Sequence, residues 1–140
     1  MKYSSRIEEH EMGAGIMLLC KKKVLVLKRG DYKEDPFSGY WNFPGGTSEK
    51  GETPYETALR ETFEETGFEE RDIRIYEHIE NRSYTMYIGV LDEEYMPVLD
   101  EEHAEYKWIP LSDVLKIENL HPKDERCFRR YIQKGRKSAF

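Results

Sequence analysis

The chain has 140 residues, a length that predicts a single domain, residues 1–140, built around one hydrophobic core. Its 28 acidic and 22 basic side chains give a net charge of −6, which argues against broad nucleic-acid binding. The longest apolar run, residues 14–20, is far shorter than the roughly 20 residues of a membrane span, so we expect a cytoplasmic protein without membrane contact.

The first third of the chain predicts a buried hairpin followed by a long loop. Gly13–Cys20 and residues 24–27 are apolar and flank three lysines, a pattern typical of two strands buried on both faces. Glycine, proline and aspartate punctuate residues 29–40, so we expect a loop there that forms one wall of a pocket. Residues 41–43 then return to strand, and the Pro-Gly-Gly that follows bends the chain.

The middle of the chain carries the start and stop signals of one helix. Thr53 is a favoured N-cap residue, and Glu56 completes its capping box. Pro54 suits the first helical position and Gly67 supplies the stop, so we predict a helix over Pro54–Thr66. At about 100° per residue, one arc of this helix should face the sheet: Tyr55, Ala58, Leu59, Thr62, Phe63 and Thr66.

The remainder of the chain predicts three more strands and two helices. The strand predictions rest on alternating apolar residues, and the helix predictions on the prolines that open each helix. We expect strands at residues 72–80, 83–91 and 104–109, a short helix near Leu111–Lys116 and a last helix from Pro122. Asn81 and Arg82 should make the turn between the first two strands. The basic residues near the chain's end suit a helix C-terminus and need no partner: Arg129, Arg130, Lys134, Arg136 and Lys137.

Three carboxylates crowd one patch of the predicted middle helix. Glu61, Glu64 and Glu65 are three and four positions apart, and like charges at that spacing destabilise an isolated helix by about 0.2–0.5 kcal/mol per pair. Arg60 can reach Glu64 and Glu52, but one guanidinium cannot neutralise all of them. A hard divalent cation such as Mg²⁺ prefers oxygen ligands and would do so; the alternative is a solvated acidic face.

The spacing of these residues resembles the Nudix box of the Nudix hydrolases, in particular the MutT-like members. The box places a glutamate six residues after a glycine, an Arg-Glu pair eight residues later and a closing Glu-Glu-x-Gly. This chain fills every charged position: Gly46, Glu52, Arg60, Glu61, Glu64, Glu65 and Gly67. Thr62 departs from the pattern because the family usually carries an aliphatic residue there. The resemblance implies an α/β fold in which a mixed β-sheet is sandwiched between helices.

The resemblance also implies an activity and its cofactor. The activity is hydrolysis of a diphosphate bond in a nucleoside diphosphate-linked small molecule, with Mg²⁺ or Mn²⁺ as cofactor. Glu64, Glu65 and the carbonyl oxygen of Gly45 would bind the metal, with Glu61 as a further ligand or a support for the catalytic base. Arg60 and Glu52 would orient these carboxylates.

A catalytic base outside the box is expected in the acidic run of residues 100–105. In related enzymes an acidic loop residue at this place often reaches the metals, and we select Glu102. The same run is also typical of an exposed acidic loop. His103 is an alternative base, because its ordinary pKa lies near neutrality.

The substrate prediction rests on residues 41–46, WNFPGG, which resemble a segment of MutT-like nucleoside triphosphate pyrophosphohydrolases. We expect a triphosphate to be cut to the monophosphate and pyrophosphate, with Trp41 and Phe43 forming or supporting a base pocket and Arg29 near the phosphates. Tyr84 lies near a tyrosine position of dinucleoside polyphosphate hydrolases, so that substrate stays open, as does a nucleotide sugar. A nucleotide-binding module without hydrolysis is a further alternative, and the oligomeric state is not indicated.

Overall fold

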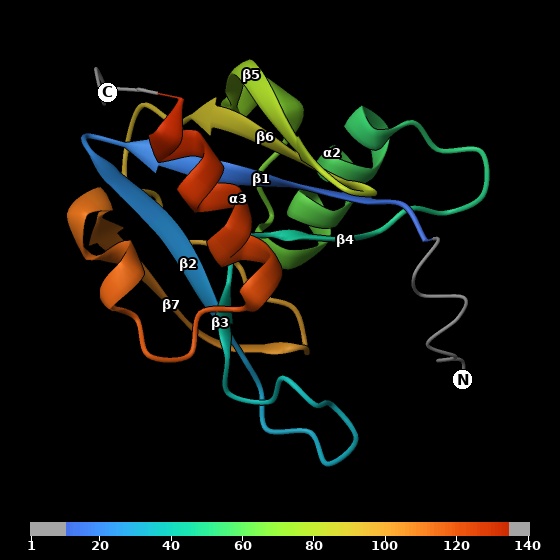
Figure 1. Cartoon of the computed structure of the whole chain (residues 1–140), viewed down its shortest axis with the longest axis vertical. Helices are drawn as coiled ribbons and strands as arrows, with labels where there is room; N and C mark the ends of the chain where they lie inside the picture. The colour runs from blue at the N-terminus through green and yellow to red at the C-terminus, as the bar shows by residue number, and fades with distance from the viewer. Residues whose placement is uncertain (1–10, 135–140) are drawn as a thin grey trace.

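The computed structural model describes residues 11–134, which form one mixed sheet with a long helix on each face (Figure 1). The strands are β1 (Gly13–Cys20), β2 (Lys23–Arg29), β3 (Trp41–Asn42), β4 (Gly45–Thr47), β5 (Arg74–Asn81), β6 (Tyr84–Val90) and β7 (His103–Pro110). The helices are α2 (Pro54–Thr66) and α3 (Pro122–Gln133), with short 3₁₀ helices η1 (Glu70–Asp72) and η2 (Leu111–Lys116). The predicted α/β class is confirmed, while Arg136 and Lys137 lie outside the described residues.

Strand β1 is the centre of the sheet. It runs antiparallel to β2 and β4 and parallel to β6, within the order β3-β2-β1-β6-β5, and β7 pairs with β2. All eight residues of β1 are buried, as its continuous apolar run predicted. Lys21 and Lys22 make the turn to β2 with φ values of 52° and 68°, the left-handed conformation of a tight hairpin.

Alternating side chains of β1 divide the core into two layers, because successive residues of a strand point to opposite faces. Met17 and Leu19 pack with the α3 residues Phe128 and Tyr131. Leu18 and its alternate neighbours pack on the other face with Ala58 of α2. Both cysteines are buried free thiols. Among residues 11–134, no helix is long and apolar enough to cross a membrane.

Helix α2 has the predicted bounds and caps. Thr53 Oγ1 accepts the Glu56 N–H at 3.1 Å, and Glu56 Oε1 accepts the Thr53 N–H at 3.0 Å. Gly67 ends the helix at a φ of 81°, in the left-handed region that suits glycine. The capping box therefore fixes where the helix begins, and so fixes the phase of every side chain that follows.

The predicted apolar arc of α2 is wrong in part. Tyr55 and Phe63 are 37% and 51% exposed, whereas Glu65 and Thr57 are buried. Hydrogen bonds explain why these two polar residues are buried. Glu65 Oε1 accepts the Gly45 N–H at 3.2 Å, and the Thr57 hydroxyl lies 2.8 Å from Glu52. These contacts turn a polar stripe of the helix toward β4 and the preceding loop. The buried residues of α2 are Thr57, Ala58, Thr62, Glu65 and Thr66.

Three further differences from the sequence predictions are local. Strand β4 was not predicted, because two glycines carry no strand propensity and its pairing with β1 is long-range. The turn between β5 and β6 consists of Arg82 and Ser83, one residue later than predicted. The segment Leu111–Lys116 is helical as predicted, but as a 3₁₀ helix.

Candidate active site

Arg60 gathers carboxylates around the middle of α2. Its Nε lies 2.6 Å from Glu52, and its Nη1 lies 2.9 Å from Glu61 and 3.3 Å from Glu64. Hydrogen bonds from Arg60 lower the pKa of Glu52 to about 2, and the same contacts raise the pKa of Arg60. We call Arg60, Glu52, Glu61 and Glu64 the Arg60 group. It ties the loop before α2 to the helix.

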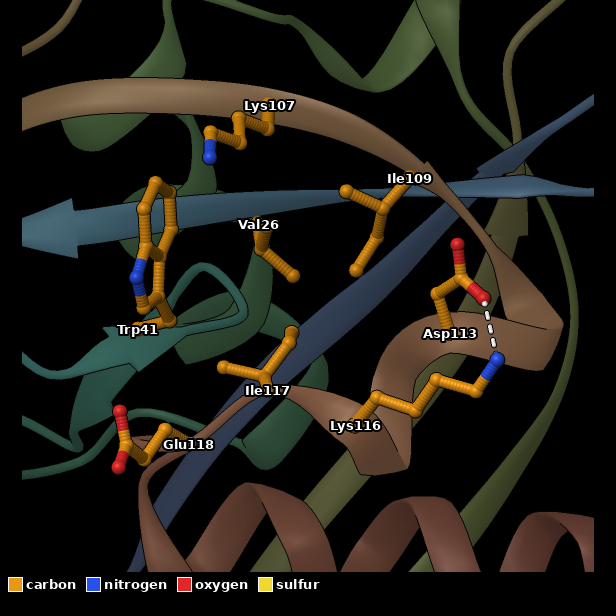
Figure 2. Close-up of a pocket in the computed structure, with 8 residues that line it drawn as sticks. All are labelled: Val26, Trp41, Lys107, Ile109, Asp113, Lys116, Ile117 and Glu118. Atoms are coloured by element: carbon orange, nitrogen blue, oxygen red, sulfur yellow. Dashed lines mark ion pairs between the residues drawn. The ribbon is translucent and has the colours of Figure 1, made fainter.

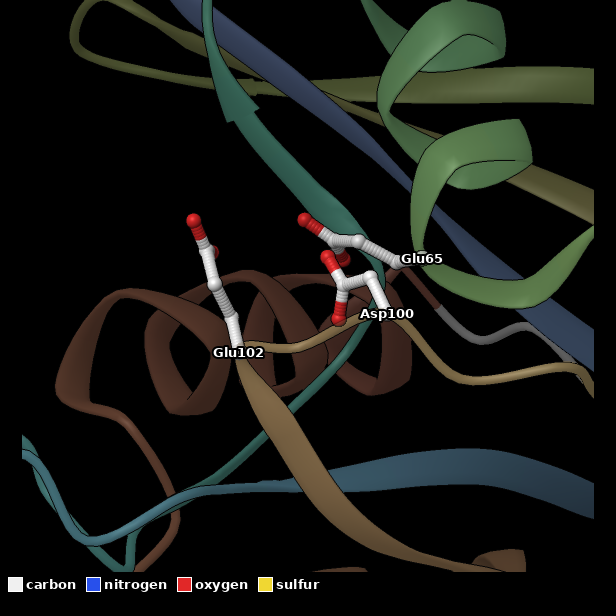
Figure 3. A group of neighbouring side chains, drawn as sticks. All are labelled: Glu65, Asp100 and Glu102. Carbon is white, nitrogen blue, oxygen red and sulfur yellow. The ribbon is translucent and has the colours of Figure 1, made fainter.

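A second set of carboxylates meets at the C-terminal end of α2, and we call Glu65, Asp100 and Glu102 the Glu65 group (Figure 3). Each offers an oxygen atom, and these atoms lie within 4.8 Å of one another. Glu65 is 4% exposed, Asp100 is half-buried and Glu102 is exposed. Within residues 11–134, no lysine or arginine forms an ion pair with any of the three.

The surroundings of Glu65 suit a bound cation. Burial raises the pKa of Glu65 well above its ordinary value, and a hydrogen bond and the charge of Glu61 raise it further. The Gly45 N–H favours the ionised form but does not cancel these effects. An all-carboxylate oxygen set with uncompensated repulsion fits a hard divalent ion such as Mg²⁺ or Mn²⁺.

The two glycines before the loop bring β4 against α2. A Cβ atom built on Gly46 would lie 2.5 Å from the carboxyl carbon of Glu61. A Cβ atom built on Gly45 would lie 2.8 Å from the Gly15 Cα. Gly45 also has a φ of 158°, which other residues rarely adopt. Only glycine therefore lets the strand backbone approach the carboxylates so closely.

The loop that carries Glu102 is held by the 30–40 loop. The Gly30 N–H donates to the Glu102 carbonyl at 2.8 Å, and the Tyr32 hydroxyl donates to the Glu101 carbonyl. Arg29, predicted near the phosphates, lies in the same region with its Nε 2.7 Å from Asp35. In this structure Arg29 braces the 30–40 loop.

His103 contacts Asp100, with Nδ1 2.8 Å from the Asp100 Oδ1, and its side chain is fully buried. This position favours orientation of Asp100 over the base role that was the alternative for His103. Asp100 itself was missed as an individual residue. The acidic run from 100 to 105 marked the region, but spacing in a loop does not tell which side chains turn toward Glu65.

Trp41 lines a pocket of about 420 Å³, which we call the Trp41 pocket (Figure 2). Val26, Ile109 and Ile117 form its apolar part, and the Lys107 ammonium lies 5.1 Å from the centroid of the Trp41 ring. The other lining residues are Asp113, Lys116 and Glu118.

Strand register connects the Trp41 pocket, through β2, to the strand that follows Glu102. Trp41 pairs with Lys28 of β2, and Lys28 pairs with Glu105 of β7. Glu105 is three residues from Glu102, or about 10 Å at roughly 3.3 Å per residue. The pocket residues Val26, Trp41 and Ile109 pack with the core layer under α3, whereas Ala58 of α2 packs with the other layer.

Two predicted substrate residues, Phe43 and Tyr84, are buried. Phe43 is fully buried and packs against Phe128 at 6.5 Å between ring centroids, so it can only support the pocket from within the core. Tyr84 is 9% exposed, and the Lys123 ammonium lies 4.1 Å from its ring centroid. This arrangement does not favour stacking of a base on the Tyr84 ring. Glu64, whose side chain is 51% exposed, belongs to the Arg60 group and not to the Glu65 group.

Comparison with known proteins identifies the family of this arrangement. The NUDIX domain family model matches residues 9–131. The chain belongs to the Nudix hydrolase family. Human nucleoside diphosphate-linked moiety X motif 6 is 30% identical to it over 118 residues, which cover 77% of this chain and 36% of that protein. The RNA pyrophosphohydrolase of Actinobacillus succinogenes is 36% identical over 59 residues, 42% of this chain and 28% of that protein.

This Nudix chain thus spans about a third of the length of these two relatives. Solved structures agree with the assignment. The MutT protein of Methanosarcina mazei Go1 has a TM-score of 0.67 and 27% identity, covering 91% of this chain and 96% of that one. A Nudix hydrolase of M. smegmatis, RenU, has a TM-score of 0.75 at 22% identity, covering 89% and 84% respectively, which shows a shared fold.

Proposed function

We propose that this Nudix hydrolase acts as a single domain that cuts a diphosphate bond in a nucleoside diphosphate-linked substrate. We propose further that its main substrate is a nucleoside triphosphate, released as the monophosphate and pyrophosphate. The observation that carries the proposal is the Glu65 group, in which three carboxylates have no lysine or arginine partner in residues 11–134 and Glu65 accepts the N–H of Gly45.

In this proposal Glu65 and Asp100 hold Mg²⁺ or Mn²⁺, and the Glu102 carboxylate lies next to them. The family resemblance adds Glu61, Glu64 and the carbonyl oxygen of Gly45 as further ligands. When bound, such an ion withdraws negative charge from the diphosphate oxygens and lowers the pKa of a bound water. The buried Glu65 has the least freedom to move, because its carboxylate accepts the Gly45 N–H.

Glu102 is proposed as the base that accepts a proton from the attacking water. It is the exposed member of the Glu65 group, so solvent can reach its carboxylate, and its backbone carbonyl is held by the Gly30 N–H at 2.8 Å. Arg60 and Glu52 are proposed to orient Glu61 and Glu64. A charged hydrogen-bond network of this kind restricts the carboxylates to one arrangement.

The Trp41 pocket is proposed to receive the nucleobase. An aromatic wall above an apolar floor is suited to a flat ring, and Lys107 at the rim favours a negatively charged ligand. The dinucleoside polyphosphate alternative rested on stacking by Tyr84, which the burial of that ring does not favour. We therefore use dinucleoside polyphosphates and nucleotide sugars as comparison substrates.

The test is a panel of substrates with the products resolved. Nucleoside triphosphates, dinucleoside polyphosphates, ADP-ribose and a triphosphate-ended RNA would be compared by kcat/KM with Mg²⁺, with Mn²⁺ and with a chelator. We expect metal-dependent release of pyrophosphate from a nucleoside triphosphate. Undiminished turnover in metal-free protein contradicts the hydrolytic mechanism, and a hundredfold preference for another substrate, about 2.8 kcal/mol, contradicts the substrate proposal alone.

A further inference from the structure

A second pocket of about 230 Å³ lies on the α3 face of the sheet, where β1 begins. Three of its lining residues are cationic, namely Arg82, Lys123 and Arg126, and one is acidic, Glu11. We call it the basic pocket. A local excess of positive charge stands out in a chain whose net charge is −6.

The cations of the basic pocket are poorly neutralised. Within residues 11–134, neither Arg82 nor Arg126 has a carboxylate partner, in contrast to Arg60 and Arg129, which pair with glutamates at 2.6 and 3.0 Å. The Lys123 ammonium lies 3.9 Å from the buried carboxylate of Asp124. A pocket that gathers unpaired arginines attracts an anion from solution.

The backbone of Arg82 is held in a conformation that is costly for arginine. Its φ is 60°, in the two-residue turn between β5 and β6, where glycine or asparagine is favoured. The turn cannot swing away easily, because the Ser83 carbonyl accepts the Gly13 N–H at 3.1 Å. The fold therefore fixes a strained arginine at the wall of this pocket.

The basic pocket adjoins the Nudix box. Gly46 and Thr47 of β4 line it, and Gly46 also lies against the carboxylate of Glu61. Arg60 Nη2 donates to the Thr47 carbonyl at 3.1 Å. A single strand thus separates the pocket from the box residues on α2.

We propose that the basic pocket binds a phosphate group through Arg82, Lys123 and Arg126. Guanidinium groups match the oxygen geometry of phosphate by forming paired hydrogen bonds. The phosphate can come from the substrate, beyond the bond that is hydrolysed, or from free pyrophosphate. The substrate source rests on the proposed function, whereas phosphate binding itself does not.

The first experiment measures binding of inorganic pyrophosphate to the metal-free protein by isothermal titration calorimetry. Without metal, the carboxylates of the Glu65 group repel anions, so binding reports the basic pocket. The double variant Arg82→Gln/Arg126→Gln is compared with Arg74→Gln/Arg130→Gln, which removes two exposed arginines that do not line the pocket. Circular dichroism checks that both variants fold.

We expect the pocket variant to bind pyrophosphate at least tenfold more weakly than wild type, and the control variant to bind within about twofold. Arg126→Lys, which keeps the charge but not the paired hydrogen bonds, should retain only part of the affinity. Equal affinities of the pocket and control variants would overturn the proposal. This result stands whether or not the protein hydrolyses any nucleotide, so it is separate from the outcome of the substrate panel.

Kinetics then assign the source of the phosphate. If the group belongs to the substrate, the pocket variant should raise KM at least tenfold with little change in kcat. If it is free pyrophosphate, KM should stay constant while the inhibition constant for pyrophosphate rises at least tenfold. Either result supports phosphate binding in the basic pocket. A pocket variant that matches the control variant in pyrophosphate affinity, KM and inhibition constant refutes the proposal.

Discussion

The Arg60 group and the Glu65 group each combine glutamates of helix α2 with carboxylates from a loop, yet their surroundings act on the carboxylates in opposite directions. Arg60 lowers the pKa of Glu52 to about 2, whereas burial and Glu61 raise the pKa of Glu65. Glu64 and Glu65 are neighbours in sequence, but about 100° of helical rotation separates their side chains. One carboxylate contacts a guanidinium at the surface, and the other faces two carboxylates from a distant loop.

The two groups differ in whether a cationic side chain of the protein contacts their carboxylates. In the Arg60 group, the guanidinium of Arg60 contacts all three glutamates and offsets part of their negative charge. The Glu65 group leaves carboxylates close together without a lysine or arginine partner in residues 11–134, so it gains most from an ion that the protein does not supply. We therefore expect substitutions in the Arg60 group and in the Glu65 group to differ in their effects on catalysis and on stability.

Glu65→Gln should have the largest effect. We expect kcat to fall by about a thousandfold, because metal charge stabilisation is lost, while the metal-free protein becomes more stable since a buried charge is removed. Melting temperatures with chelator and with saturating Mg²⁺ check the second part: Mg²⁺ should stabilise wild type and not the variant.

Glu64→Gln is the matched control for that change. It should also lower kcat, but it should not stabilise the metal-free protein, because Glu64 is half-exposed and contacts Arg60. A Glu65→Gln enzyme with near-normal kcat, or equal gains in stability from both substitutions, would contradict the division into two groups.

Glu102→Gln should lower kcat by about a hundredfold if Glu102 is the base. Because the amide keeps an oxygen donor, the concentration of Mg²⁺ needed for half-maximal stabilisation should change much less. Asp100→Asn is the comparison within the same loop, and it should weaken metal binding more than Glu102→Gln does. A negligible change in kcat for Glu102→Gln would return the base role to Glu61 or His103.

Arg60→Gln should affect stability more than chemistry. Removing the guanidinium leaves the carboxylates of the Arg60 group unpaired, so we expect the melting temperature to fall by several degrees and kcat by about tenfold. Arg60→Lys should recover only part of both, because an ammonium lacks the planar fork. An unchanged melting temperature for Arg60→Gln would show that the group does not brace the helix.

Trp41→Ala tests a region that belongs to neither group. We expect KM for the preferred nucleotide to rise about tenfold, with kcat and Mg²⁺-dependent stabilisation nearly unchanged, because stacking is lost without disturbing the carboxylates. Trp41→Phe should keep most of the affinity. If Trp41→Ala leaves KM and the preference among nucleobases intact, the base binds elsewhere.

We expect the smallest effect from a substitution at His121. This residue lies at the start of α3 and is far in sequence from the Arg60 group and the Glu65 group. Burial, and then the charge of Lys123, lower its pKa to about 4 from 6.5. The contribution of neutral His121 to folding stability is therefore fully present above pH 6.5. It is lost as the pH falls toward 4. His121→Asn keeps an N-cap acceptor without titrating. Urea unfolding at pH 7 and 4.5 should show a smaller loss of stability for the variant; an equal loss would contradict the assignment.

The sequence by itself determined the features whose physics is local. The capping box at Thr53, the stop at Gly67 and the spacing from Glu52 to Glu65 depend on neighbours within a few residues, so the helix and the Arg60 contacts were predictable. Only the tertiary structure decided the rest. It brought Asp100 and Glu102 to Glu65, and it closed Tyr84 beneath Lys123. These outcomes depend on contacts between residues far apart in sequence, such as the pairing of β4 with β1 and the hydrogen bond from Gly45 to Glu65, and no local pattern encodes such contacts.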